Sequence, residues 1–132
     1  MSTSAADDTG AVAVVRFPPA SGQPGRLLLS GYLRRPDGAG PFPAVVLLHG
    51  CGGDAEGLDR NWGARLRALG YVSLTVDSFG PRGLVTSCHT GPPAGRNFDA
   101  FGALDYLATQ PFVRPADVAL MGFSGGRHDH AP

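Results

Sequence analysis

Lysine is absent from the chain, and all eleven basic residues are arginine. A Walker-type phosphate loop, a Schiff-base lysine and a lysine general base are therefore excluded. Eleven acidic residues balance the arginines, so no net positive charge exists to hold nucleic acid or an anionic membrane. The apolar runs are far shorter than the roughly 20 residues that span a bilayer. We expect neither a nucleic acid nor a membrane as partner.

The N-terminal residues 1–10 lack the basic and apolar regions of a secretory signal, so we expect a cytoplasmic protein. Only two cysteines are present, Cys51 and Cys88, and they form no Cys-x-x-Cys metal motif. Cytoplasmic thiols normally stay reduced. Two reduced thiols are therefore favoured over the alternative, a disulfide that ties two loops at the rim of the site.

The chain of 132 residues is long enough for one domain. Its content of 42% hydrophobic and 17% charged residues is typical of a globular chain rather than a disordered one. We expect a disordered N-terminus over residues 1–10, a folded domain over residues 11–126, and a short tail over residues 127–132.

Apolar and β-prone segments predict five strands, over residues 11–17, 26–34, 44–48, 71–76 and 117–121. The first two are joined by a tight turn and should pair antiparallel. The other three are continuously apolar, which is typical of strands covered on both faces.

Two helical stripes separate these last three strands. The first consists of Trp62, Leu66 and Leu69, with Gly70 as the C-cap, and the second of Phe98, Phe101, Leu104 and Leu107. Strands that alternate with helices predict an α/β fold with a mostly parallel sheet and the N-terminal hairpin at its edge.

The sequence Gly-Phe-Ser-Gly-Gly at residues 122–126 directly follows the last expected strand. It matches Gly-x-Ser-x-Gly, the nucleophile elbow, in which a sharp turn from strand to helix leaves room only for glycine beside the serine. Ser124 is therefore the candidate nucleophile. A structural glycine turn is the alternative, and the preceding apolar strand favours the elbow.

A second glycine-rich loop, His-Gly-Cys-Gly-Gly at residues 49–53, follows the strand over residues 44–48. Such a loop supplies backbone N–H groups to an oxyanion hole. We assign one donor to the Cys51 N–H, with Gly52 as the neighbouring candidate, and the other to the Gly125 N–H. The alternative is a turn shaped only for the helix that follows.

Three stretches of the sequence, residues 43–53, 69–83 and 111–124, together resemble the dienelactone hydrolase family of the α/β-hydrolases. The resemblance covers roughly residues 26 to 126 and implies an α/β-hydrolase-type sheet that stops after the nucleophile-elbow strand. It also implies hydrolysis of a small-molecule ester or lactone through an acyl-enzyme, with no metal or organic cofactor. The eponymous enzymes have a cysteine nucleophile where this chain has Ser124, which favours an esterase-type member.

The acid and the histidine of a catalytic triad come after the nucleophile in this fold, and only six residues follow Gly126. His128, Asp129 and His130 have suitable side chains, but they would enter the helix after the elbow, so we expect neither a triad nor a metal site there. We therefore expect the sequence to be the N-terminal half of a hydrolase, truncated after the elbow. Its last strand would then present an open apolar edge, which predicts self-association.

Two polar residues follow the strand over residues 71–76. We expect Asp77 to cap nearby backbone N–H groups rather than to contact substrate, and Arg82 to be a solvated loop residue rather than a carboxylate ligand. Nucleotide binding is disfavoured, because the turn after the first parallel strand lacks Gly-x-Gly-x-x-Gly. The alternative to a hydrolase is an inactive fragment, or a binding or assembly module that uses the same half-sheet.

Overall fold

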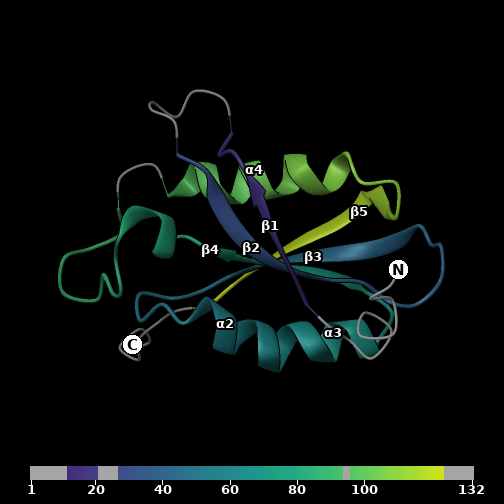
Figure 1. Ribbon diagram of the computed structural model, residues 1–132, viewed down its shortest axis with the longest axis horizontal. Coiled ribbons are helices and arrows are strands. Elements are labelled where there is room, and N and C mark those ends of the chain that lie inside the picture. Colours follow the sequence, from purple (N-terminus) through teal and green to yellow (C-terminus); the bar gives the residue numbers. More distant parts are fainter. Residues whose placement is uncertain (1–11, 21–26, 94–95, 124–132) are drawn as a thin grey trace.

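The computed structural model describes residues 12–20, 27–93 and 96–123. A five-stranded sheet lies between two helical layers (Figure 1). Its strands are β1 (Ala13–Phe17), β2 (Leu29–Arg34), β3 (Phe42–Leu48), β4 (Val72–Asp77) and β5 (Val113–Gly122). Helix α4 (Asn97–Ala108) covers one face. The other face is covered by α2 (Ala55–Leu58), the π-helical turn η1 (Asp59–Gly63) and α3 (Ala64–Ala68).

The strand order in the sheet is β1-β2-β4-β3-β5. Strands β1 and β2 pair antiparallel, as do β2 and β4, whereas β3 pairs parallel with both β4 and β5. The expected α/β architecture, with an antiparallel hairpin at the edge of a parallel sheet, is confirmed. Because β3, β4 and β5 run parallel, their C-terminal ends lie side by side at one end of the sheet.

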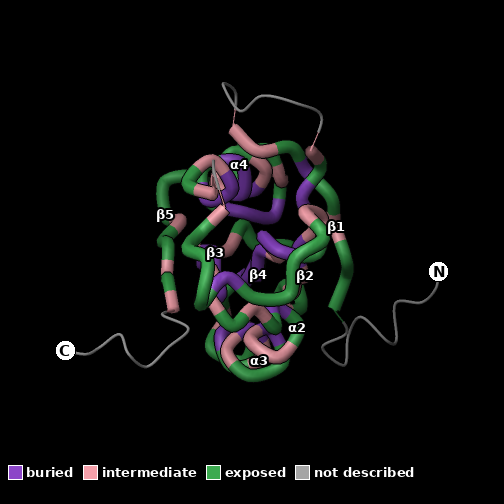
Figure 2. The backbone as a smooth tube through the Cα atoms, turned by 90° about the vertical axis from the view of Figure 1, so that its left-hand side faces the viewer, coloured by how far each residue is buried: buried purple, intermediate pink, exposed green. Residues whose placement is uncertain are grey.

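Both faces of the two central strands are buried, as the unbroken apolar sequence indicates. On the α4 face, Val46, Leu74 and Val76 are fully buried with Leu107 of the helix. On the opposite face, Val45 and Leu47 pack with Leu66. In Figure 2 the buried backbone is concentrated in the middle of the sheet, while β1 and β5 at its two edges are largely exposed.

The helical stripes differ from the sequence expectation at two positions. Leu69 is 73% exposed and Phe101 is 53% exposed. Leu69 lies beyond the end of α3, where Gly70 adopts a positive φ of 96° and ends the helix, as expected of a C-cap glycine. Phe101 belongs to a series with a three-residue spacing, which advances only about 300° per step and drifts around a helix of 3.6 residues per turn.

Candidate functional site

The loop at residues 49–53 leaves the end of β3 and lies against the long connection that follows β4. Gly53 has a φ of 78°, and a Cβ atom there would lie 2.6 Å from the Val85 carbonyl oxygen. Only glycine combines this left-handed conformation with such a close backbone approach. The glycine-rich sequence therefore lets the loop turn back tightly beneath residues 85–88.

His49 anchors the start of this loop, with its side chain buried against Phe79. The two rings meet edge to face at 4.5 Å between centroids. The Ser78 N–H donates to His49 Nε2 at 3.0 Å, which requires Nε2 to be unprotonated. The proton must then reside on Nδ1, which donates to the Gly50 carbonyl at 2.8 Å. Burial lowers the pKa of His49, reinforced by the charge of Arg96 and opposed by the bond to Gly50 and by two acidic neighbours.

The bonds to carbonyl oxygens in this loop set the direction of its N–H groups. In a planar trans peptide the C=O and N–H point in opposite directions. The Gly50 carbonyl accepts from the Gly53 N–H and from His49, and the Cys51 carbonyl accepts from the Ser87 N–H. Within the described part of the chain, the N–H groups of Cys51 and Gly52 meet no hydrogen-bond acceptor. Cys51 and Gly52 are two of the three candidate oxyanion donors expected from the sequence; the third, Gly125, lies outside the described residues.

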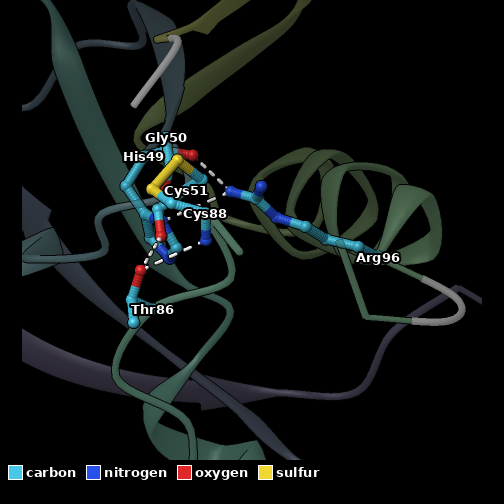
Figure 3. Close-up of a disulfide and its surroundings, with 6 residues drawn as sticks. All are labelled: His49, Gly50, Cys51, Thr86, Cys88 and Arg96. Carbon is cyan, nitrogen blue, oxygen red and sulfur yellow. Dashed lines mark hydrogen bonds between the residues drawn. A yellow bond between two sulfur atoms is a disulfide. The ribbon is translucent and has the colours of Figure 1, made fainter. Parts of the chain in front are cut away.

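Cys51 and Cys88 form a disulfide, with their Cα atoms 4.8 Å apart (Figure 3). The expectation of two reduced thiols is therefore wrong, and the alternative, a disulfide that ties the two loops together, is correct. The two cysteines are 37 positions apart in the sequence, with a helical layer and strand β4 between them, so no local pattern indicated that they lie close together. The parallel pairing of β3 with β4 brings their following loops together.

Arg96, at the N-terminus of α4, reaches across to the same loop. Its Nη2 donates to the His49 carbonyl oxygen (Figure 3). The Arg96 guanidinium also lies 5.4 Å from the centroid of the Phe79 ring. Half-burial lowers the pKa of Arg96, while Asp99 opposes and Arg82 adds to that effect. Because Nδ1 of His49 carries its proton, the 3.3 Å approach of Arg96 to that atom is a contact between two donors rather than a hydrogen bond.

The end of β5 lies directly beside the start of this loop. Gly122 pairs with Leu48, and the Phe123 N–H donates to the Leu48 carbonyl at 2.9 Å. Ser124 and Gly125, expected to be the nucleophile and an oxyanion donor, lie outside the described residues, as does the tail with His128, Asp129 and His130.

Among the described residues, two cavities lie at the C-terminal ends of these strands, and Phe123 contributes to both. One, of about 330 Å³, is bounded by the ends of β3 and β5 and the start of α4. The other, of about 310 Å³, lies over the glycine-rich loop and the beginning of α2. The two cavities thus lie on either side of Phe123, the residue that follows β5.

The two polar residues after β4 behave differently from each other. Asp77 accepts from the N–H groups of Phe79 and Gly80 at 3.0 and 2.8 Å, which confirms its expected capping role. Arg82 is not a solvated loop residue, because it makes a bidentate pair with the fully buried Asp99 at 2.7 and 3.0 Å and donates to the Ser78 carbonyl. Arg82 belongs to the 3₁₀ turn η2 (Gly80–Arg82) and Asp99 to the first turn of α4, so this ion pair connects the two turns.

Three residues of the site were not assigned a role from the sequence: His49, Arg96 and Asp99. The position of His49, directly after a buried strand and before glycines, was the available signal. Arg96 and Asp99 gave none, since they act across contacts distant in sequence.

Within residues 12–20, 27–93 and 96–123, no three His, Cys, Asp or Glu side chains are grouped so as to hold a metal ion. No helix of the described chain is both long and apolar enough to cross a bilayer.

The architecture and this loop arrangement define the chain as having an α/β-hydrolase-type fold. Solved structures agree: the fold resembles a dienelactone hydrolase-like promiscuous phosphotriesterase, P91, from metagenomic libraries (TM-score 0.61, 26% identity over 86% of this chain and 50% of that one). It also resembles 2,6-dihydroxy-pseudo-oxynicotine hydrolase (TM-score 0.66, 19% identity, 86% of this chain and 30% of that one). Esterase Est22 is similar as well (TM-score 0.65, 21% identity, 85% of this chain and 34% of that one).

The resemblance expected from the sequence is therefore confirmed in the structure, where the matches are dienelactone hydrolase-like proteins, esterases and a hydrolase. Neither a family model nor a curated protein matches the chain. The chain spans half the length or less of these three structures.

Proposed function

We propose that this chain is the nucleophile-bearing part of a serine hydrolase that acts on small-molecule carboxylic esters or lactones. One observation carries the proposal. Gly122, the last residue of β5 and two residues before Ser124, pairs with Leu48. Leu48 directly precedes the loop at residues 49–53, in which two N–H groups meet no acceptor in the described chain. A nucleophile and oxyanion donors at adjoining strand ends are the arrangement that acyl transfer needs.

In the proposed reaction, the Ser124 oxygen attacks the substrate carbonyl and forms an acyl-enzyme. The bond to the alcohol oxygen breaks, which releases the alcohol of an ester or opens the ring of a lactone, whose hydroxyl stays on the acyl group. The Cys51 and Gly125 N–H groups stabilise the oxyanion, with Gly52 as the neighbouring candidate. Water then cleaves the acyl-enzyme. A histidine and an acid must move the protons, and we propose that they belong to a longer protein, consistent with the partial coverage of the matched hydrolases.

Fluorophosphonate labelling tests this function. An activated serine oxygen forms a bond to phosphorus and displaces fluoride, while its proton passes to the histidine base. In the protein of native length, we expect the label on the tryptic peptide of residues 97–127, which stays whole because Pro115 protects Arg114. Ser124→Ala should abolish labelling, whereas Ser30→Ala on β2 should not.

The possible outcomes distinguish two parts of the proposal, the activated Ser124 and the need for a longer chain. Absence of label on Ser124 in the native protein would contradict the hydrolase. Label on a species of 13.6 kDa would contradict the need for a longer chain. Label on a species of roughly twice that mass, the usual size of a whole α/β domain, would support both.

A second candidate is an inactive assembly module, and the open edge of β5 is the observation that favours it. Strand β5 pairs with β3 on one side, and in the described residues no strand covers its other side. An unpaired edge can take up a further strand from another chain. We propose that the 132-residue chain by itself also self-associates through this edge, whichever of the two candidates holds.

The cytoplasmic location expected from the sequence stays a prediction, and the disulfide weighs against it. Disulfides persist in oxidising compartments and are rare in the cytosol, where they are usually transient. Alkylation of free thiols in intact cells, followed by mass measurement, distinguishes a reduced protein in the cytoplasm from a disulfide-bonded protein in an oxidising compartment. Alkylated Cys51 and Cys88 would indicate the reduced, cytoplasmic protein.

A further inference from the structure

Cys51 is held to the loop of residues 86–88 at three points. Its sulfur is bonded to Cys88, and its carbonyl accepts from the Ser87 N–H at 2.9 Å and from Thr86 Oγ1 at 3.0 Å. The Thr86 hydroxyl oxygen also accepts from the Cys88 N–H at 3.2 Å. Figure 3 shows the disulfide and this hydroxyl on adjacent sides of Cys51.

These attachments fix the direction of the one remaining backbone group of Cys51. Its Cα carries three heavy-atom substituents: the carbonyl carbon, Cβ and the nitrogen. The hydrogen bonds hold the carbonyl and the disulfide holds Cβ, so tetrahedral geometry leaves the nitrogen little freedom. The Gly50 carbonyl, on the same peptide as the Cys51 N–H, is held by His49 and Gly53, which sets the N–H direction.

The loop has few other contacts that could hold it against Cys51. Residues 84–93 contain no helix or strand, and Val85 is 82% exposed. Its backbone contacts with residues 49–53 include the Ser87 N–H bond to Cys51 and the close packing of the Val85 carbonyl against Gly53. The disulfide and the Thr86 hydroxyl are therefore the side-chain groups that connect residues 84–93 to the glycine-rich loop at residues 49–53.

We propose that Thr86 and Cys88 are positioning residues that hold the Cys51 N–H in the orientation that stabilises the oxyanion; the inference rests on the proposed hydrolase function. Preorganised donors act on charge that develops in the transition state, so a misaligned N–H lowers kcat with little effect on substrate binding. Removal of a whole oxyanion donor costs about 10²–10³ in kcat. Loosening one donor should cost less, about tenfold.

The test is steady-state hydrolysis of a p-nitrophenyl ester by the protein of native length. Thr86→Val keeps the shape and removes the hydroxyl, and we expect kcat to fall about tenfold with KM within about twofold of its original value. Thr86→Ser restores a hydroxyl and should restore kcat. Thr90→Val is the matched control, because the Thr90 side chain makes no hydrogen bond within the described chain. Cys88→Ser, and a dithiol that reduces the bond to two thiols, test the covalent attachment.

Equal kcat in Thr86→Val, Cys88→Ser and the original protein would overturn the inference, as would a raised KM at constant kcat. Failure of Thr86→Ser to rescue kcat would also overturn it. If Cys88→Ser does not fold, Thr86→Val and the reduced protein decide. A protein that neither hydrolyses the ester nor takes the fluorophosphonate label instead contradicts the proposed function.

Discussion

His49 shows how a single buried side chain can organise a loop. Its ring accepts one hydrogen bond from Ser78 and donates another to Gly50, so its two nitrogens have fixed and opposite roles. A positively charged imidazole has two N–H groups and cannot accept from Ser78. The folded protein therefore requires the neutral ring.

This requirement predicts a loss of stability in acid. Burial lowers the pKa of His49 in the folded state. In the unfolded chain the His49 pKa has the ordinary histidine value of about 6.5. As the pH falls through that value, the unfolded chain therefore takes up a proton at His49 before the folded protein does. The free energy of unfolding should decrease from that pH downward, by at most about 1.4 kcal/mol per pH unit from this group, and the contribution is fully present only above it.

Chemical denaturation between pH 5 and 8 measures this effect, with the slopes set by the linkage relation. His49→Gln should flatten the pH dependence, because the amide does not titrate. His89→Gln, which removes an exposed imidazole, is the control and should leave the slope in place. An unchanged slope in His49→Gln would contradict the assignment.

The polar residues differ in how far their roles could be predicted from the sequence. The capping role of Asp77 involves N–H groups only two and three residues away, so local sequence was sufficient to predict it. Arg82 pairs with Asp99, which lies 17 residues further along the chain. No short pattern indicates that pairing, and the expectation of a solvated arginine failed for that reason.

At the scale of elements, the sequence located strands and helices but did not orient every helix. In α4, the buried face contains Ala100, Ala103 and Leu107, which follow the three- and four-residue spacing of a helix stripe. The aromatic Phe101 lies outside that face. The stripe expected from the sequence consists of large apolar residues at a constant three-residue spacing, whereas the buried face of α4 consists mainly of small residues at helical spacing.

The orientation of α4 predicts different costs for two apolar truncations. Leu107→Ala removes a fully buried side chain and should lower the free energy of unfolding by about 2–5 kcal/mol, through lost burial and the cavity left behind. Phe101→Ala, the matched control, removes a side chain that is 53% exposed, and should change it by about 0.5 kcal/mol or less. Urea denaturation measures both, and equal costs would contradict the described face of α4.

The second helical layer shows another limit of pattern reading. The π-helical turn η1 separates α2 from α3 and widens the helix locally, which shifts the register of the residues that follow. Leu58, Trp62 and Leu66 still pack against the sheet, but Leu69 does not. Leu69 lies beyond the last residue of α3, Ala68. A uniform helical period predicted neither the π-helical turn nor the end of the helix before Leu69.

At the scale of the molecule, the open edge of the sheet is the main feature. The two strands at the sheet edges, β1 and β5, are largely exposed, and β5 ends beside the proposed site. Leu120 on β5 is 49% exposed. Such an edge favours pairing with another chain.

The 132-residue chain should accordingly self-associate in a concentration-dependent way, measurable by sedimentation velocity. Leu120→Lys places a charge on the edge strand and should shift the population toward monomer. Leu69→Lys, at a more exposed leucine after α3, is the control and should leave association unchanged. A chain that stays monomeric at all concentrations would exclude association through β5.

Local sequence determined the order of the elements, the parallel sheet and the glycine-rich loop at residues 49–53. Each of these depends on short-range periodicity, on backbone freedom at glycine, or on continuous burial of apolar strands. The disulfide, the tautomer of His49 and the Arg82–Asp99 pair were decided by the tertiary structure alone. They join residues that are 17 to 37 positions apart in the chain. The pairing of β3 with β4 brings together the loops that contain His49, Ser78 and the two cysteines. The packing of α4 against β4 brings Asp99 to Arg82.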